Sequence, residues 1–311
     1  MDALPVRESS LESRVPVKEK FCSEIEGCSH ACGHDGHMAI GLSLAHYIAS
    51  EIDNLKSDYI LIFQPAEEGV RGAAGMCNAW KYGKIDELYC CHIGFAPEDT
   101  FVAGAEGFLA TTKLDLAFHG KSAHAGLAPE RGKNALLAAA RAAIEMEEIP
   151  RPKEGITRLN VGKLSGGQAR NAIPESAKMQ LETRGQTKEL NEYMKRQALR
   201  CVDRSCARYQ VSYDISYKGE SISGKSSPEL ARQVYEKACQ IKAFPDNLVS
   251  YHFGASDDGA VFMDMVQKQG GQAVYMLFGC KTTGLHHESV FDFDPEVLER
   301  ALKILKETAM L

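Results

Sequence analysis

The sequence predicts an α/β fold in which a mostly parallel-sheet domain carries a second, inserted domain. Helical and strand patterns alternate over residues 36–91 and again over residues 228–306, as expected where helices connect parallel strands. Between them, residues 112–219 follow the order βαββαβ, the ferredoxin-like split unit, which can form a small domain of its own. We therefore expect residues 1–111 and 220–311 to build one domain around the insertion.

Each element follows from apolar spacing and from turn residues. In the first α/β stretch, apolar residues at helical spacing from Met38 to Ile48 predict a helix over 36–52. The apolar run "YILIF" at 59–63 predicts a strand. The remaining predicted helices are 73–82, 134–148, 189–209, 228–243 and 295–306, and the remaining strands are 88–91, 113–120, 157–164, 178–185, 211–219 and 273–279.

Composition excludes several classes of protein. A net charge of −6 and a pI near 6.0, without a clustered basic stripe, argue against nucleic-acid binding. No apolar run approaches membrane-spanning length, and the polar N-terminus carries no secretory signal. Ten scattered cysteines, several in apolar surroundings and none in paired CxxC motifs, indicate free thiols in a reducing cytoplasm rather than disulfides or a zinc ribbon.

Two adjacent carboxylates, Glu67 and Glu68, follow the predicted strand 59–63 in the stretch "FQPAEEG". Ligands and catalytic groups gather at the carboxyl ends of strands in α/β proteins. Because neighbouring side chains diverge, one carboxylate can bind a cation while the other takes a proton from an activated water. The alternative is a solvated acidic turn, since most exposed charge has no specific role.

The densest polar cluster is "HACGHDGHMA", in which Cys32 and His34 stand at the start of the predicted helix. Thiolate and imidazole ligands together suit a transition metal such as zinc, manganese or cobalt. A histidine at such a place can instead be a helix-start or core residue. His92 ends one predicted strand, and His286 with His287 follow another, so all of these side chains can converge on one crevice.

Eight segments, in order and spacing, resemble one family of enzymes. They are "MDALPV", "ACGHDGHMA", "QPAEEG", "CHIG", "GKSAHAG", "GGQARNAIP", "LETRG" and "HHESVFDFDPE". Together they are similar to the amidohydrolase branch of the di-metal aminoacylase/carboxypeptidase peptidases, which includes hippurate hydrolases and amidohydrolases of indole-acetyl amino acids. The resemblance covers essentially the whole chain.

The resemblance implies a site with two divalent metal ions, manganese or zinc. Its ligands would be Cys32, His34, Glu68, His92 and His287. His287 is preferred to His286 because the family pattern places the ligand four residues before a phenylalanine, here Phe291. Glu67 would be the general base and later the proton donor. His30 and His37 are read as neighbours of the site, and His46, His119 and His252 as structural residues.

The resemblance also makes residues 112–219 a lid and dimerisation domain. His124 would reach from this lid into a partner subunit's site and stabilise the oxyanion. Asn171 and Arg184 would bind the substrate carboxylate, a task that suits the planar guanidinium of arginine. Each has a structural alternative: His124 as a loop cap, Asn171 as an Asx-turn residue, and Arg184 as a surface charge. The partner would be a second copy or a related subunit.

The implied function is a cytoplasmic amidohydrolase that cleaves N-acyl or N-aroyl amino acids, aminobenzoyl-glutamate-type substrates first, by attack of a metal-bound hydroxide. Two alternatives stay open. Met1 is the methionine of "MDALP", so strands that precede this motif in the family would be missing and Asp2 would lie at a free terminus. The chain would then be a truncated, non-catalytic subunit. The other alternative is a hydrolase with Cys32 as nucleophile. Asp257 and Asp258 are given no role.

Overall fold

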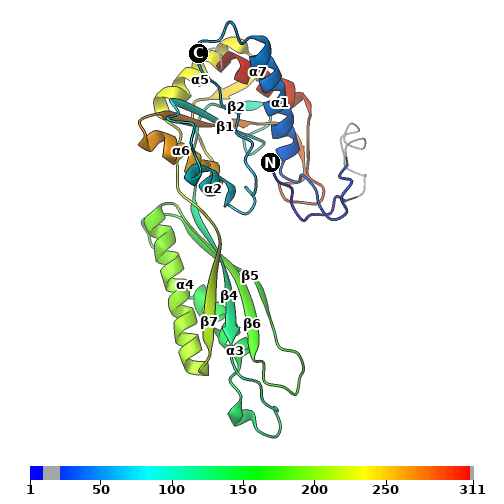
Figure 1. Ribbon diagram of the computed structural model, residues 1–311, viewed down its shortest axis with the longest axis vertical. Helices are drawn as coiled ribbons and strands as arrows, with labels where there is room; N and C mark the ends of the chain where they lie inside the picture. Colours follow the sequence, from blue (N-terminus) through cyan, green and yellow to red (C-terminus); the bar gives the residue numbers. More distant parts are fainter. Residues whose placement is uncertain (10–21, 309–311) are drawn as a thin grey trace. The chain divides into compact units, whose positions relative to one another are not determined.

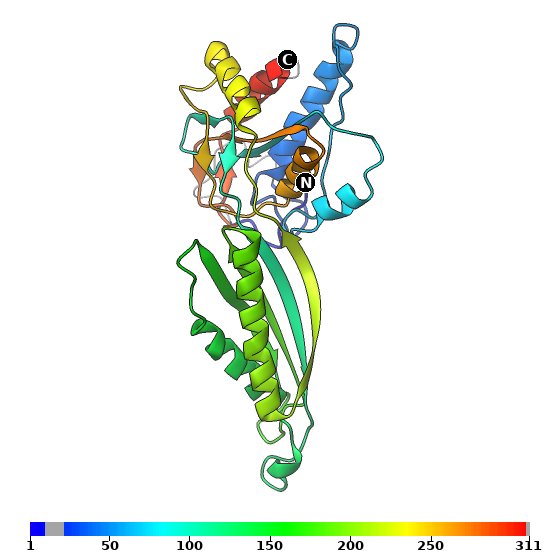
Figure 2. The ribbon, with the colours of Figure 1, turned by 90° about the vertical axis from the view of Figure 1, so that its left-hand side faces the viewer.

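The computed structural model describes residues 1–9 and 22–308, and the chain divides into two units. Unit 1 comprises Met1–Phe108 with Gly224–Leu311, and unit 2 comprises Leu109–Ser223. Unit 2 is the green part of the chain in Figure 1 and Figure 2. Among the helices of the described residues, none combines the length and the apolar character that spanning a membrane requires.

Unit 1 is built on a four-stranded sheet in the order β1-β10-β2-β8. These strands are β1 Glu87–Ile93, β10 Gln272–Phe278, β2 Thr100–Val102 and β8 Asp246–Leu248. β1 pairs parallel with β10 and β2 pairs parallel with β8, but β10 and β2 are antiparallel. The predicted α/β class is thus confirmed, with a mixed sheet. Two short pairs complete the unit: parallel β3 Ala105–Glu106 with β9 Tyr251–His252, and antiparallel β11 Thr282–Thr283 with β12 Asp292–Phe293.

Helices cover both faces of this sheet, which explains why β10 is an almost continuous apolar run. They are α1 His34–Ser50, α2 Gly72–Asn78, α5 Pro228–Ile241, α6 Gly259–Lys268 and α7 Glu296–Thr308. Figure 1 shows α1, α5 and α7 on one side of β1 and β2, and α2 with α6 on the other. The main core lies under α5 and α7, where Val234 and Ile304 pack with Ile93, Phe101 and Phe278.

Two predictions for unit 1 are wrong. The run 59–63 forms no strand, because it pairs with no described segment; Ile60, for example, remains 46% exposed. The apolar side chains alone predicted a strand, but a strand also needs a partner for its backbone hydrogen bonds. The second helix, α2, ends at Asn78 rather than residue 82. Helix α6 was not predicted, although its buried residues Phe262, Met263 and Val266 follow helical spacing.

Unit 2 contains a four-stranded antiparallel sheet in the order β5-β6-β4-β7, with two helices on one face. Its elements are β4 Ala110–His119, the short 3-10 turn η2 Pro129–Arg131, α3 Ala135–Glu147, β5 Thr157–Gly166, β6 Ser176–Gly185, α4 Lys188–Tyr209 and β7 Ser212–Ser221. The side chains of Asn134 and Thr187 cap α3 and α4 by accepting hydrogen bonds from backbone N–H groups. Phe118, Met146 and Met194 are fully buried between helices and sheet.

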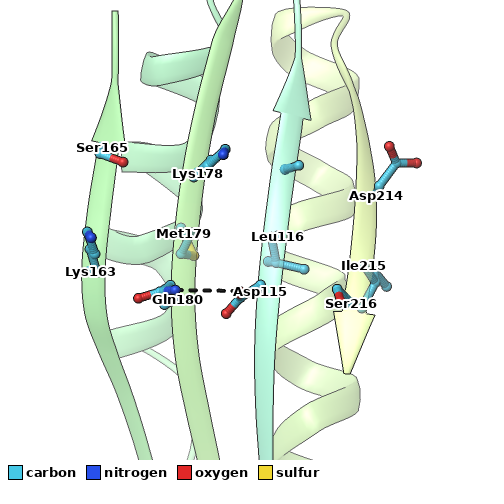
Figure 3. Close-up of a pocket in the computed structure, with 11 residues that line it drawn as sticks. Asp115, Leu116, Lys163, Ser165, Lys178, Met179, Gln180, Asp214, Ile215 and Ser216 are labelled. Atoms are coloured by element: carbon cyan, nitrogen blue, oxygen red, sulfur yellow. Dashed lines mark hydrogen bonds between the residues drawn. The ribbon is translucent and has the colours of Figure 1, made fainter. Parts of the chain in front are cut away.

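The other face of the unit 2 sheet is polar. Figure 3 shows a hollow on this face, with Lys163, Lys178, Gln180 and Asp214 projecting from the strands and both helices behind the sheet. Gln180 donates a hydrogen bond to Asp115 across two strands, at 3.4 Å. The hollow contains none of the predicted site residues, and its positive and negative groups alternate, so it resembles an ordinary solvated sheet face.

We expect Phe118→Ala to destabilise unit 2 by about 3–5 kcal/mol, because the substitution leaves a cavity where a fully buried ring lay. Urea unfolding followed by circular dichroism measures this change. Ile144→Ala, at a position 67% exposed on α3, is the control and should change the free energy of unfolding by no more than about 0.5 kcal/mol. Equal effects of the two substitutions would contradict the described core.

Candidate metal centre

The start of α1 brings Cys32 and His34 into the core of unit 1. Gly33, the residue before the helix, has a φ of 80°, a left-handed conformation that glycine adopts without strain. This turn leaves Cys32 only 4% exposed and His34 only 3% exposed. The N–H of His287 donates to the carbonyl of Ala31 at 2.7 Å, which holds the turn after β11 against the same segment.

His34 and His92 are oriented by backbone carbonyls. Nδ1 of His92 donates to the carbonyl of Ile93 at 2.7 Å, and Nδ1 of His34 donates to the carbonyl of Asp2 at 2.9 Å. In each neutral ring the lone pair is then on Nε2, as in histidines that bind metals. Nε2 of His92 lies 3.6 Å from Sγ of Cys32, and Nε2 of His34 lies 3.7 Å from Oε2 of Glu67.

The loop that carries Glu67 and Glu68 has an unusual backbone. Ala66 has a φ of 55° and Val70 a φ of 46°, and a β-branched residue adopts such a value only when its surroundings impose it. The carboxylate of Asp2 accepts from the N–H of Glu67 at 2.9 Å and from the N–H of Glu68 at 3.2 Å. These contacts fix the backbone at both glutamates, and Oε2 of Glu68 lies 3.3 Å from Nε2 of His287.

All five predicted metal ligands and the predicted base belong to one cluster. Potential ligand atoms lie within 4.8 Å of one another in three overlapping sets: Cys32, His34 and His92; Cys32, Glu68 and His287; and His34, Glu67 and Glu68. Ligands of a tetrahedral ion at bond lengths near 2.1 Å are about 3.4 Å apart, close to the separations given above. Because Cys32 is shared by two sets, the arrangement suits two neighbouring cations. The roles of the individual residues stay predictions.

Ionisation in the cluster also suits divalent cations. Burial raises the pKa of the Cys32 thiol far above its usual range, and Glu68 and Glu67 raise it further. Burial likewise raises the pKa of Glu67, with the neighbouring Asp257 and Glu68 as further causes. Burial lowers the pKa values of His34 and His92, so both rings are neutral and able to bind a metal. A cation would offset the crowded negative charge and displace the protons.

His37 and His286 support the cluster from outside it. Nε2 of His37 accepts from the N–H of Ile93 at 2.9 Å, and Nε2 of His286 donates to the carbonyl of Ile93 at 3.2 Å. The ring of His286 also stacks on Phe95 at 3.8 Å, and its burial lowers its pKa to about 4. Both imidazoles therefore bind the backbone at the end of β1, where His92 stands.

Asp257 and Asp258 had no predicted role, yet the structure places both beside Glu67. Asp257 accepts hydrogen bonds from the hydroxyl of Tyr275 and from the N–H of Gly259. Asp258 is fully buried. Two adjacent aspartates within an otherwise small and apolar segment, "GASDDGAVF", were the signal that could have marked them as buried, because aspartate is rarely buried without partners.

The three predicted residues of unit 2 do not converge within one chain. Nδ1 of His124 accepts from the N–H groups of Gly126 and Leu127, each at 3.1 Å, which matches its alternative as a loop cap. The carbonyl of Asn171 lies next to it and accepts from the N–H of Ala125 at 2.9 Å. Both lie beyond the end of the sheet at which His119 pairs with Ser176.

Arg184 stands near the other end of the same sheet. It pairs with Thr111 across β4 and forms an ion pair with Glu182 at 3.1 Å. Eight residues of β6 separate it from Ser176, or about 27 Å at ~3.4 Å per residue. Arg184 and the His124–Asn171 loops therefore cannot touch the same small ligand in one chain.

We expect the metal-free protein to lose part of its stability as the pH rises from about 5 to about 8, because carboxyls whose pKa values are raised by folding stabilise the fold only while protonated. For Glu67 the loss begins above 4.5, the ordinary value, and continues through its raised pKa. Glu67→Gln removes this titration. The wild-type melting temperature in EDTA, relative to that of the variant, should fall as pH rises; each group contributes at most about 1.4 kcal/mol per pH unit. A constant difference would contradict the raised pKa.

Known proteins share this sequence and fold. The chain matches Peptidase family M20/M25/M40 over residues 1–311. It is 40% identical over 305 residues to a p-aminobenzoyl-glutamate hydrolase homolog of Haemophilus influenzae, covering 98% of this chain and 72% of that protein. It is also 40% identical over 312 residues to an indole-3-acetyl-aspartic acid hydrolase of Enterobacter agglomerans, covering 100% and 72%.

Two solved structures extend the comparison. An aminobenzoyl-glutamate utilization protein from Klebsiella pneumoniae superposes with a TM-score of 0.81 at 38% identity, covering 90% of this chain and 68% of that one. A dinuclear metal binding peptidase of the M20 family from Bacillus subtilis shares the fold, with a TM-score of 0.70 at 20% identity and coverage of 99% and 78%. The resemblance predicted from eight motifs is confirmed: the chain belongs to Peptidase family M20/M25/M40 and is a hydrolase that acts on amide bonds.

Proposed function

We propose that this protein is a metal-dependent amidohydrolase that removes an acyl or aroyl group from an acidic amino acid, with p-aminobenzoyl-glutamate as the first candidate substrate. The observation that carries the proposal is the cluster of one thiol, three imidazoles and two carboxylates around Cys32. The names of two relatives support the substrate class, because both describe an aromatic acyl group linked to glutamate or aspartate. The truncated, non-catalytic subunit is not favoured, since the full ligand set is present.

Cys32, His34, Glu68, His92 and His287 would hold two divalent cations. The mixed thiol, imidazole and carboxylate set suits zinc, and manganese is the second candidate. Such cations polarise an amide carbonyl and make water a stronger nucleophile at neutral pH. A dinuclear metal-binding member of the same family supports the number of ions.

Glu67 would move the proton. Its carboxylate is near the cluster without belonging to the proposed ligand set, so Oε2 can take a proton from the attacking water. Burial and the neighbouring Asp257 favour the protonated form of Glu67 by raising its pKa. The carboxyl group can therefore keep the proton until the leaving amine nitrogen accepts it. Asp2 holds the N–H groups of both glutamates and so keeps the two side chains apart.

Unit 2 would be the ferredoxin-like lid and dimerisation domain, with the two segments of unit 1 forming the catalytic domain. In this arrangement His124 stabilises the oxyanion, and Asn171 and Arg184 bind the substrate carboxylate. Because Arg184 and the His124–Asn171 loops lie at opposite ends of one sheet, the two ends would serve different copies in a dimer. The partner would be a second copy or a related subunit. All ten cysteines are free thiols, which suits a cytoplasmic protein.

The first test is hydrolysis of p-aminobenzoyl-glutamate by the purified chain with Mn²⁺ or Zn²⁺, followed by release of p-aminobenzoate. We expect EDTA to abolish turnover and Glu67→Gln to lower kcat by about 100- to 10,000-fold while metal binding persists, because only the proton carrier is lost. Glu87→Gln, at an exposed position on β1, is the control. Activity that survives metal removal would instead support Cys32 as a nucleophile, and metal binding without turnover would support the non-catalytic alternative.

The second test asks whether His124 acts across subunits. His124→Ala and Glu67→Gln should each be inactive as pure proteins. After the two are mixed and allowed to exchange subunits, half of the dimers are mixed, and each has one complete site. We therefore expect recovery to about a quarter of wild-type activity for a two-fold symmetric dimer. No recovery, with exchange verified by native mass spectrometry, would contradict a homodimer with shared sites.

A further inference from the structure

Asp258 contacts the two ends of the loop that carries Glu67 and Glu68. It is fully buried at the start of α6, between the sheet and α2. Oδ2 accepts from the N–H of Ala73 at 2.9 Å, in the first turn of α2. Oδ1 accepts from the side-chain amide of Gln64, three residues before Glu67. One carboxylate therefore joins a residue before the glutamate pair to a residue after it.

The loop between these two anchors closes on itself. A Cβ added at Gly72 would overlap the carbonyl oxygen of Pro65, so the backbone at the two ends of residues 65–72 is in contact. Within this closed loop, Ala66 and Val70 have positive φ values. Positive φ at such residues persists only where the surroundings fix the backbone, because relaxation to an ordinary conformation is favourable. Asp258 supplies hydrogen bonds at the loop ends, whereas Asp2 contacts its middle.

We infer that Asp258 is a positioning residue whose two hydrogen bonds hold the glutamate loop closed, so that Glu68 faces His287 and Glu67 faces His34. The inference rests on the proposed metal site for its functional consequence, but not for the tether itself. Asp258 belongs to a different element from the cluster residues it supports, and its carboxylate uses one oxygen for each anchor. A neutral residue with the same hydrogen-bonding capacity should therefore replace it.

The substitution Asp258→Asn separates the tether from the charge. An asparagine keeps an oxygen for the N–H of Ala73, and its amide can donate to the oxygen of Gln64 once that side-chain amide is reversed. Asp258→Ala removes both hydrogen bonds and leaves two buried donors unsatisfied. Asp264→Asn is the matched control, because Asp264 lies on the same helix but faces Lys268 at the surface, at 2.7 Å.

The experiment measures three quantities for the wild type and the three variants: Zn²⁺ affinity by calorimetry, kcat and KM for p-aminobenzoyl-glutamate, and hydrogen exchange of residues 65–73 in the metal-free protein. We expect Asp258→Ala to lower metal affinity and kcat by about 10- to 100-fold, with KM changed less than about 3-fold, and to speed exchange of the loop. Asp258→Asn and Asp264→Asn should stay within about 3-fold of wild type in all three.

Several results would overturn the inference. Asp258→Asn that behaves like Asp258→Ala would mean that the charge acts and not the tether. Loop exchange unchanged in Asp258→Ala would mean that the loop stays closed without the tether. If Asp258→Ala does not fold, Gln64→Ala removes one anchor alone and should still speed loop exchange; unchanged exchange would overturn the inference. If the wild type binds no metal, the proposed function fails, while loop exchange still tests the tether.

Discussion

Negative charge crowded into a buried space is the constraint on which the rest of unit 1 depends. Cys32, Glu67, Glu68 and Asp257 lie together, and each raises the cost of ionising its neighbours. An assembly of this kind is stable when its acids are protonated or when cations replace the protons. The same arrangement that costs stability in the absence of a cation gives the cluster its affinity for one. Imidazoles kept neutral by burial complete a set of donors without adding charge.

The scaffold fixes this cluster through backbone groups rather than through further side chains. The carbonyls of Asp2 and Ile93 orient His34 and His92, and the carbonyl of Ala31 holds the turn that carries His287. Backbone carbonyls in a packed core move little, so the Nε2 atoms are held toward the cluster before any ligand arrives. Strained φ values at Ala66, Val70 and His287 lie in segments beside the cluster. Preorganisation of this kind lowers the cost of assembling a metal site.

Unit 2 obeys a different constraint. Its helices cover one face of a long antiparallel sheet, and the opposite face is polar, so the unit forms a core of its own. The length of its strands separates Arg184 from His124 and Asn171 by more than a small substrate can span. Any function that uses both ends must therefore engage more than one copy, or use the two ends for different purposes. That conclusion follows from strand register alone.

Periodicity and motif content determined the α/β class, most helices and the residues that belong to the cluster. Apolar spacing specifies which face of a helix is buried, so α1, α4 and α7 were predicted to within about three residues at each end. Ordered motifs identified Cys32, His34, Glu68, His92 and His287 although up to 255 residues separate them along the chain (287 − 32).

Only the tertiary structure decided how those residues meet and what surrounds them. The run 59–63 has strand-like side chains but no strand partner among the described residues, a property of its neighbours and not of its own sequence. Asp257 and Asp258 look like ordinary turn residues until α6 packs against the glutamate loop and buries them. Hydrogen bonds between residues distant in sequence, such as Asp258 to Gln64, have no periodic signal. Local patterns report which face of an element is buried, whereas long-range packing sets the partners that each polar group finds.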